Sequence, residues 1–420
     1  MIGNPQPRQP TLPPRGGILQ ISHARAAIGR GRRDPWLLVA EGFHSRGGMD
    51  KANAALANYL VSHGVPVHLV AFSIDPEIGC KPGVTCTSTR IAGRWPSLER
   101  SHLARRGRAM ALRLTSHSRN ARVVVNGINC NWPDINWVHW LHQCWQPPAL
   151  KAPLWFRLKH RLETSRAIHL EHTVFRSARL LVANSERTRR DLISLLGVSA
   201  ERIHTIYLGT DSAWKALTPD RREAGRAWLG VPPGRPLVAF VGALGYDSRK
   251  GFDILWRAWV DLCALAEWDA DLVVAGNGRA LPDWRREAAR SGLGGRVRFL
   301  GFTDRVFDVL AASDLLVSPA RYESYGLNVQ EALCCGVPAI VSAGAGVAER
   351  YSSDLSPMLL PNPEDACDLA ARMLHWRRDM AGWRKRLEPT MQILRTYTWN
   401  DMASRIVNLA ESSKAIERCQ

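Results

Sequence analysis

The segment Glu323-Ser-Tyr-Gly-Leu-Asn-Val-Gln-Glu331 holds two carboxylates with seven residues between them. A Gly326-Leu327 turn separates them and is expected to open a helix, with Glu331 about a turn and a half inside it. The first backbone N–H groups of such a helix can receive an anion such as a diphosphate. A carboxylate on the preceding loop, here Glu323, can accept hydrogen bonds from sugar hydroxyls. The segment therefore predicts a nucleotide-sugar site, although the same spacing also occurs on ordinary solvated helix faces.

Apolar runs alternate with amphipathic stretches along the whole chain, which is typical of parallel α/β sheets covered by helices. The strands expected in the first half are Trp36–Glu41, Val65–Phe72, Arg122–Asn126, Ile135–Trp140, Leu180–Asn184 and Ile203–Tyr207. Those expected in the second half are Leu237–Gly242, Leu272–Gly276, Val297–Gly301, Leu315–Ser318 and Ala339–Ser342. The pattern predicts two tandem Rossmann-like domains that face each other across a cleft. Ligands in such folds bind at the carboxyl ends of the strands.

A chain of 420 residues suits two domains of about 150 to 200 residues each. We expect a flexible, basic, Pro- and Arg-rich tail over residues 1–34 and an acceptor domain over 35–211. A linker with a short helix is expected over 212–235, a nucleotide-sugar donor domain over 236–395, and a helix that crosses back to the first domain over 396–420.

The net charge is +18, and much of it comes from the tail and from residues 94–122. A surface this basic suits anionic membrane lipid, an anionic substrate or nucleic acid, and it can also be a solvated face without a partner. Nucleic acid is the least supported partner, because no zinc-finger, helix-turn-helix or RNA-binding signature accompanies the charge.

No apolar run approaches the roughly 20 residues that span a bilayer, and the N-terminus lacks the apolar region of a secretory signal. We therefore expect a cytoplasmic protein that can lie peripherally on the inner face of the membrane. Nine cysteines without a Cys-x-x-Cys pair argue against a disulfide framework and a zinc ribbon. Neither half carries a Walker loop, and the absence of a complete dinucleotide fingerprint disfavours hydride transfer.

The order of the motifs resembles the retaining, GT-B-fold glycosyltransferases of family four, also known as glycosyl transferases group 1. The matching segments of the second half are Phe240–Gly242, Ser248–Leu255, Val273–Gly278, Val297–Thr303, Ala312–Pro319, Glu323–Glu331 and Gly336–Val341. The resemblance is dense from Pro236 to Tyr351 and looser in the first half, where Gly47–Asn53 resembles the glycine turn under the first helix.

The resemblance implies a role for each matching residue. Lys250 would pair with the donor diphosphate and stabilise its charge as the glycosidic bond breaks. The amides of Gly326 and Leu327 would receive the diphosphate, Glu331 would accept hydrogen bonds from the ribose, and Glu323 would contact the transferred sugar.

Other donor contacts are implied by the same resemblance. Gly48 would let the backbone of the opposing turn approach the phosphate, and the backbone near Gly276 and Phe302 would contact the base. Many relatives carry an arginine where this chain has Ala243. Arg249 either supplies that second positive charge or faces solvent.

Relatives also place a histidine of the first domain near the reactive carbon of the sugar. We favour His139 slightly over His142, and His44 is a third alternative. Either of the first two can instead be a satisfied histidine in an aromatic cluster with Trp137 and Trp140. Retaining transfer on one face of the sugar, with the leaving phosphate taking the acceptor proton, would require neither a dedicated base nor a metal or other cofactor.

The sequence thus predicts a retaining hexosyltransferase that uses a nucleotide-diphosphate sugar. Its partners would be a glycan or lipid-linked acceptor in cell-envelope assembly and an anionic membrane surface, without nucleic acid. Two alternatives stay open. One is a nucleotide-sugar epimerase, and the other is a catalytically degenerate relative that binds a partner or a membrane through its basic surface.

Overall fold

The computed structural model describes residues 33–89, 96–145, 147, 152–211, 214 and 218–419. The predicted tail over residues 1–34 lies outside this part except for Arg33 and Asp34, and so do residues 90–95 and part of the predicted linker. Residues from Asp34 onward form one compact unit.

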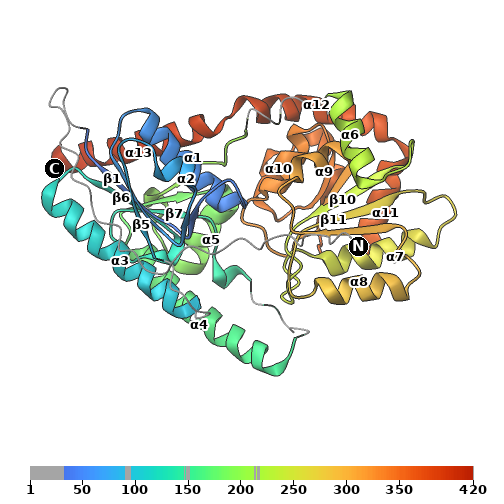
Figure 1. Cartoon of the computed structure of the whole chain (residues 1–420), viewed down its shortest axis with the longest axis horizontal. Helices are drawn as coiled ribbons and strands as arrows, with labels where there is room; N and C mark the ends of the chain where they lie inside the picture. Colours follow the sequence, from blue (N-terminus) through green and yellow to red (C-terminus); the bar gives the residue numbers. More distant parts are fainter. Residues whose placement is uncertain are drawn as a thin grey trace, which may run out of the picture. The chain divides into compact units, whose positions relative to one another are not determined.

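The first sheet has seven strands in the order β5-β3-β1-β6-β7-β8-β9 (Figure 1). They are β1 (Trp36–Val39), β3 (Val67–Ala71), β5 (Val84–Ser88), β6 (Arg122–Asn126), β7 (Ile135–Val138), β8 (Leu180–Ala183) and β9 (Ile203–Thr205). All neighbouring strands are parallel. The strand order reverses between β1 and β6, so a crevice is expected there at the carboxyl ends of the strands. A short pair, β2 (Gly42–Phe43) and β4 (Ser73–Ile74), lies beyond that edge.

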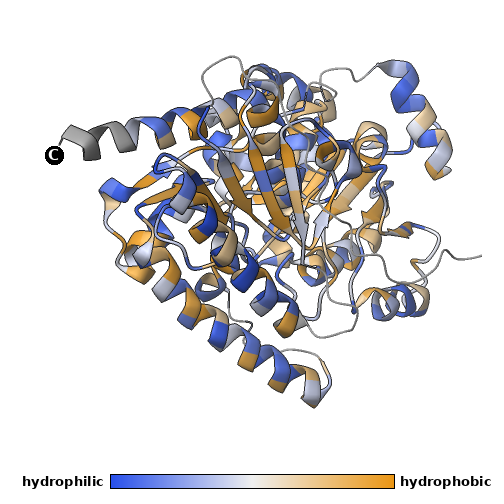
Figure 2. Ribbon diagram, turned by 60° about the vertical axis from the view of Figure 1, so that its left-hand side comes forward, coloured by the Kyte–Doolittle hydropathy of each residue, from blue (hydrophilic) through white to orange (hydrophobic). Residues whose placement is uncertain are grey.

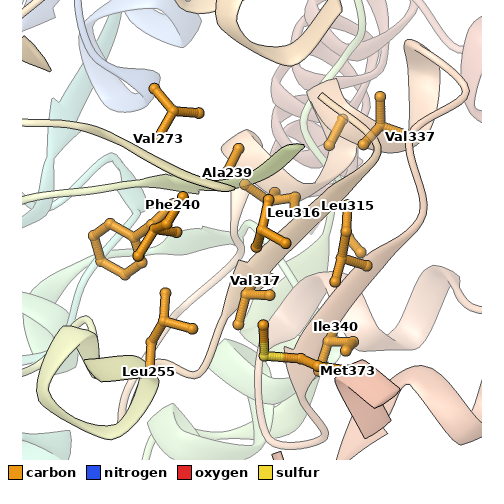
Figure 3. Close-up of a cluster of buried hydrophobic side chains, with 14 of the residues drawn as sticks. Ala239, Phe240, Leu255, Val273, Leu315, Leu316, Val317, Val337, Ile340 and Met373 are labelled. Atoms are coloured by element: carbon orange, nitrogen blue, oxygen red, sulfur yellow. The ribbon is translucent and has the colours of Figure 1, made fainter. Parts of the chain in front are cut away.

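The second sheet has six parallel strands in the order β12-β11-β10-β13-β14-β15. They are β10 (Leu237–Val241), β11 (Asp271–Ala275), β12 (Val297–Gly301), β13 (Leu315–Ser318), β14 (Ala339–Ser342) and β15 (Leu359–Leu360). Its central strands are buried on both faces, as their nearly continuous apolar sequences require. Figure 3 shows this core, where Phe240, Leu316 and Val317 of the sheet pack with Leu255 and Met373 of the covering helices.

Helices cover both faces of each sheet, and Figure 2 shows the apolar strands between them. In the first half they are α1 (Gly48–Ser62), α2 (Pro76–Gly79), α3 (Pro96–His117), α4 (Leu154–Ser177) and α5 (Glu186–Leu196). In the second half they are α6 (Pro219–Leu229), α7 (Phe252–Cys263), α8 (Leu281–Arg290), α9 (Val306–Ala312), α10 (Leu327–Cys334), α11 (Ala366–Arg378) and α12 (Met380–Thr396). The last helix, α13 (Trp399–Cys419), returns to the first sheet and packs on α1.

The two faces of the first sheet carry different helices because side chains alternate along each strand. Leu38 and Val124 share a buried cluster with α1 and α13. Leu37 and Val39 point the other way, toward α3. The strands β7 and β8 continue that second face under α4 and α5. The helices α3, α4 and α5 therefore cover one face of this sheet.

The predicted fold class is confirmed, and the strands expected from apolar runs are present with ends that differ by a few residues. The edge strands β5 and β15 were missed. The first is half-polar and exposed, and the second is only two residues long. Helix α6 lies inside the predicted linker and packs on α9. In the part of the chain that the structure describes, no helix is long and apolar enough to cross a membrane.

Candidate functional site

The site is built around the start of α10, which follows β13 after a loop that carries Glu323. Gly326 caps the helix with a φ of 107°, in the left-handed region that favours glycine. A Cβ at this position would lie 2.9 Å from Val347 Cγ1. Asn328 Nδ2 donates a hydrogen bond to the carbonyl oxygen of Val241 at 2.8 Å. The helix start is thereby fixed against the carboxyl end of the central strand β10.

Glu323 is a buried carboxylate that is paired with Lys250, whose Nζ donates a hydrogen bond to Glu323 Oε2. Burial by itself would raise the pKa of Glu323. The charges of Lys250, Arg249 and Arg187 outweigh that effect and hold the pKa below its usual value. Glu323 is therefore ionised at neutral pH, inside a group of three cationic side chains.

Arg249 does not face solvent. Its guanidinium lies 4.4 Å from the centroid of the Trp140 ring, which belongs to the loop after β7. Its Nε is also 3.8 Å from Asp247 Oδ2. Trp140 in turn packs against the ring of Tyr322, the residue before Glu323. The first-half loop after β7 and the second-half loop after β10 thus meet beside the Glu323 carboxylate.

Glu331 lies just over one turn into α10 and pairs with a residue of the first half. Lys51 Nζ donates a hydrogen bond to Glu331 Oε1 at 3.2 Å. Burial raises the pKa of Glu331, because the charge of Lys51 offsets the loss of solvent only in part. A Cβ on Gly48 would lie 3.2 Å from Leu327 Cδ2. The starts of α1 and α10 therefore face each other at close range.

Lys51 is a site residue that the sequence reasoning missed. It stands in the Gly47–Asn53 segment, from which only Gly48 was selected. A cation in the first turn of a helix is unfavourable near the positive end of the helix dipole. That placement was a usable signal that the residue has an acidic partner elsewhere.

The three histidines have different surroundings. His139 is buried against Trp137, with ring centroids 4.4 Å apart, and burial lowers its pKa to about 3. Its Nε2 is buried without a hydrogen-bond partner. His142 is partly exposed, and its Nδ1 lies 2.8 Å from the buried carboxylate of Glu171. His44 pairs with Asp50 at the start of α1, with 3.6 Å between Nε2 and Oδ2.

His139 approaches the Glu323 loop through its backbone. Ser324 Oγ donates a hydrogen bond to the carbonyl oxygen of His139 at 2.6 Å. The carbonyl oxygen of Ser324 in turn accepts a bond of 2.6 Å from Ser185 Oγ. Ser185 caps α5, and its side chain accepts a hydrogen bond from the backbone N–H of Thr188. The loop that holds Glu323 is therefore fastened to two elements of the first sheet.

Glu349 makes a further connection between the two halves that the sequence did not reveal. Its carboxylate accepts hydrogen bonds from the backbone N–H groups of Glu186 at 2.9 Å and Arg187 at 2.6 Å, at the start of α5. It also accepts one from the Tyr207 hydroxyl at 3.0 Å. A carboxylate at a helix N-terminus satisfies free N–H groups and interacts favourably with the helix dipole. Here that carboxylate comes from the other half of the chain.

Replacing Glu349 by Ala is expected to destabilise the protein by about 1–2 kcal/mol, the usual cost of losing a helix cap. Denaturant unfolding at pH 7 measures the change. Glu349→Gln keeps an acceptor but loses the charge, so an intermediate loss is expected. Equal stability of all three proteins would show that this contact contributes nothing to folding.

The remaining predicted donor residues lie at the carboxyl edge of the second sheet. Gly276 follows β11 with a φ of 152°, and a Cβ there would lie 1.8 Å from the carbonyl oxygen of Gly242. Only glycine permits this approach of two strand ends. Phe302 follows β12, and its side chain is 65% exposed. An exposed aromatic ring at this edge is available for stacking.

Positive charge gathers beside the start of α10. Lys250, Arg249 and Arg187 surround the first carboxylate, and Lys51 faces the second. Among the described residues, no group of three or more His, Cys, Asp or Glu side chains is placed to hold a metal ion. The arrangement can bind an anion and two sets of hydroxyl groups on opposite sides of it.

Two family models match the chain, one in each half. The model described as Glycosyltransferase Family 4 matches residues 46–214. The model described as Glycosyl transferases group 1 matches residues 235–379. The first match begins at the turn before α1, and the second contains every strand of the second sheet.

A curated relative and two solved structures are similar to this chain. The D-inositol 3-phosphate glycosyltransferase of Mycolicibacterium gilvum is 34% identical over 206 residues, which are 47% of this chain and 44% of the relative. The match thus spans less than half the length of that relative. Sucrose-phosphate synthase from Thermosynechococcus elongatus has a TM-score of 0.71 at 20% identity, covering 91% of this chain and 100% of the other. Anabaena HepE in complex with UDP and glucose has a TM-score of 0.64 at 18% identity, covering 90% of this chain and 100% of the other.

The similarity to the two solved structures shows the fold. The two family models, which together match residues of both halves, show the family. The chain belongs to family four of the glycosyltransferases, which have the GT-B fold.

Proposed function

We propose that the protein transfers a sugar from a nucleotide-diphosphate donor to an acceptor hydroxyl, with retention of configuration. The observation that carries the proposal is the pair of the buried Glu323 carboxylate with the partly buried Lys250 ammonium beside the start of α10. A cation held by a neighbouring carboxylate is oriented before the donor arrives. Preorganised charge of this kind stabilises an anion that develops on the leaving group.

Each residue then has a role in the proposed reaction. The N–H groups at the start of α10 and the Lys250 ammonium receive the diphosphate, and Arg249 adds charge from the same loop. Glu323 accepts hydrogen bonds from the transferred sugar. Glu331 accepts them from the ribose, in exchange for the contact it makes with Lys51. Gly48 leaves room for the donor between the two helix starts.

The proposal assigns no general base to His139. A histidine whose pKa is about 3 stays neutral at the pH of the cell. It can still offer its unpartnered Nε2 to a sugar hydroxyl or a backbone group. The departing diphosphate takes the acceptor proton, and the cationic side chains supply the positive charge, so neither a metal nor another cofactor is assigned to the reaction.

The acceptor we propose is a glycan or a lipid-linked sugar of the cell envelope, in keeping with the basic charge of the chain. The name of the Mycolicibacterium gilvum relative supports a second class, a phosphorylated cyclitol. Both classes offer hydroxyl groups next to negative charge. Transfer assays with inositol phosphate and with anionic glycolipid fractions distinguish them.

Donor binding is tested by thermal unfolding with UDP-, GDP-, ADP- and TDP-sugars. A ligand at a hundred times its dissociation constant adds about 2.7 kcal/mol to stability. We expect stabilisation by one nucleotide class, and loss of that stabilisation in Glu331→Ala. UDP-glucose is the first donor to test, because the similar HepE structure contains UDP and glucose.

Two results would contradict the proposal. Stabilisation by none of the donors, in a folded sample, would favour a protein that binds a partner without catalysis. Conversion of the donor sugar without any acceptor would favour an epimerase.

A further inference from the structure

The first half of α4, residues 154–166, stands outside the packed core. The buried residues of this helix all lie in its second half, and they are Ala167, Glu171, Val174 and Phe175. The first half instead carries four large apolar side chains that are 60% to 77% exposed, namely Leu154, Trp155, Leu158 and Leu162. An exposed apolar patch of this size on one short segment indicates an interaction surface.

These four side chains form a continuous stripe. Successive residues of a helix turn by about 100°, so all four fall within an arc of about 100°. We call them the α4 stripe. Cationic residues line both of its edges, with Arg157 and Arg161 on one side and Lys159 and Arg166 on the other. The one carboxylate of this half, Glu163, lies on the far side of the helix.

Among the residues that the structure describes, the second half approaches the stripe at Trp155, where the Arg279 guanidinium lies 5.9 Å from the ring centroid. Phe156 lies on the opposite side of the helix, where its ring is 5.8 Å from that of Tyr246. The Arg279 guanidinium is 5.2 Å from the Phe156 ring. Tyr246 and Arg279 belong to the second half and follow β10 and β11. The second half therefore holds one side of α4, and in the described part of the chain the leucines of the stripe stay largely exposed.

We propose that the α4 stripe docks on an anionic lipid surface. Leu and Trp side chains enter the boundary between headgroups and acyl chains, and flanking Lys and Arg side chains reach the phosphate groups. The helix α3 covers the same sheet face and adds exposed cations at Arg105, Arg106, Arg108 and Arg113. An anionic surface is complementary to this whole face.

Charge also argues against a second copy of this chain as the occupant. Two α4 stripes packed against each other would bring four cations of one copy close to the four of the other. Glu163 pairs with Lys159 of its own helix at 3.9 Å and lies away from the stripe, so it offsets this repulsion only in part. A lipid surface with negative headgroups removes the repulsion instead of creating it.

Docking would place the site near the membrane. Tyr246, which α4 contacts, is four residues before Lys250 on the same loop. A membrane under the α4 stripe would therefore present a lipid-linked acceptor close to that loop. This consequence rests on the proposed function, whereas the binding of lipid itself does not depend on catalysis.

Vesicle flotation of the full chain tests the inference. The probes are vesicles of phosphatidylcholine with and without phosphatidylglycerol, at 50 mM and 500 mM salt. The variant Leu158→Glu/Leu162→Glu is compared with Leu265→Glu/Ile393→Glu, which makes the same charge change at exposed positions elsewhere. We expect the stripe variant to bind anionic vesicles at least about tenfold more weakly than wild type. The control variant should stay within about twofold of wild type.

Three outcomes would overturn the inference. They are no preference of the wild type for anionic vesicles, equal losses in both variants, and a wild-type dimer that the stripe substitutions convert to a monomer. Donor stabilisation is measured on the same samples. If the protein binds a donor but not the vesicles, only this inference is rejected. If it binds the vesicles but no donor, only the proposed function is rejected.

Discussion

Replacing Lys250 by Met is expected to lower kcat by about a hundred- to a thousandfold, the usual effect of removing one preorganised charge from a developing anion. The donor KM should change less, because the amides at the start of α10 and the contacts of Glu331 remain. Steady-state kinetics with the donor identified by thermal unfolding measures both constants. The matched control is Lys385→Met, which removes an exposed lysine from α12.

The same substitution changes the pH dependence of stability. In the wild type, the pKa of Glu323 lies below its unfolded value, because nearby cations outweigh burial. The pair therefore contributes stability above the unfolded pKa of about 4.5, and the contribution is lost as the pH falls through the folded pKa. Lys250 is the largest of the charges that oppose burial, so its loss should move the folded pKa of Glu323 upward from its wild-type position. The difference in stability between the two proteins should be large at pH 7 and should shrink below about pH 4.

A second variant separates the effect on kcat from the effect on the pH dependence of stability. Lys250→Met/Glu323→Gln removes both charges, so its stability should lose most of this pH dependence while its activity stays low. Wild-type kcat in Lys250→Met would show that this lysine does not stabilise the leaving group. Unchanged stability across the pH range would show that the pair contributes little to folding.

The sequence predicted features of this protein that are local in the chain. The strands of the second sheet follow from short apolar runs between turn residues, since a strand buried on both faces has no other pattern. The helix start at Gly326 and Leu327 follows from the chemistry of helix ends. The Glu323 and Glu331 carboxylates could be singled out as candidates because the helix start between them is also local.

Contacts between the two halves could not be predicted in this way. Lys51 and Glu331 are far apart in sequence, and the residues around either one do not indicate that the other is its partner. Glu349 caps a helix that begins more than a hundred residues earlier. The environment of His139 depends on how the loop after β7 is buried. The sequence of that loop, in which tryptophan and histidine lie close together, does not determine this burial.

Gly346 is the position where a small change should have the largest effect on the contact between the halves. A Cβ there would lie 2.1 Å from the carbonyl oxygen of Ser324 and 2.7 Å from Ser185 Oγ and Cβ. Its N–H also donates to the carbonyl oxygen of Glu323 at 3.1 Å. Its φ is not in the left-handed region, so the obstacle to a side chain is space alone. Gly346→Ala is expected to cost about 1–3 kcal/mol of stability, as overpacking usually does.

The effect on activity should exceed the effect on folding. To admit a methyl group, the Ser324 carbonyl must move and the loop with Glu323 must follow, and a shift of about 1 Å can lower the rate roughly a hundredfold. Donor stabilisation in thermal unfolding should persist, because the start of α10 is untouched. Gly295→Ala is the control, since a Cβ there meets no atom within 4 Å. If Gly346→Ala is folded and keeps wild-type kcat, the close contact between Ser185, Ser324 and Gly346 does not position Glu323. The first half of the chain then aligns the carboxylate through its other contacts with this loop, those of His139 with Ser324 and of Trp140 with Tyr322.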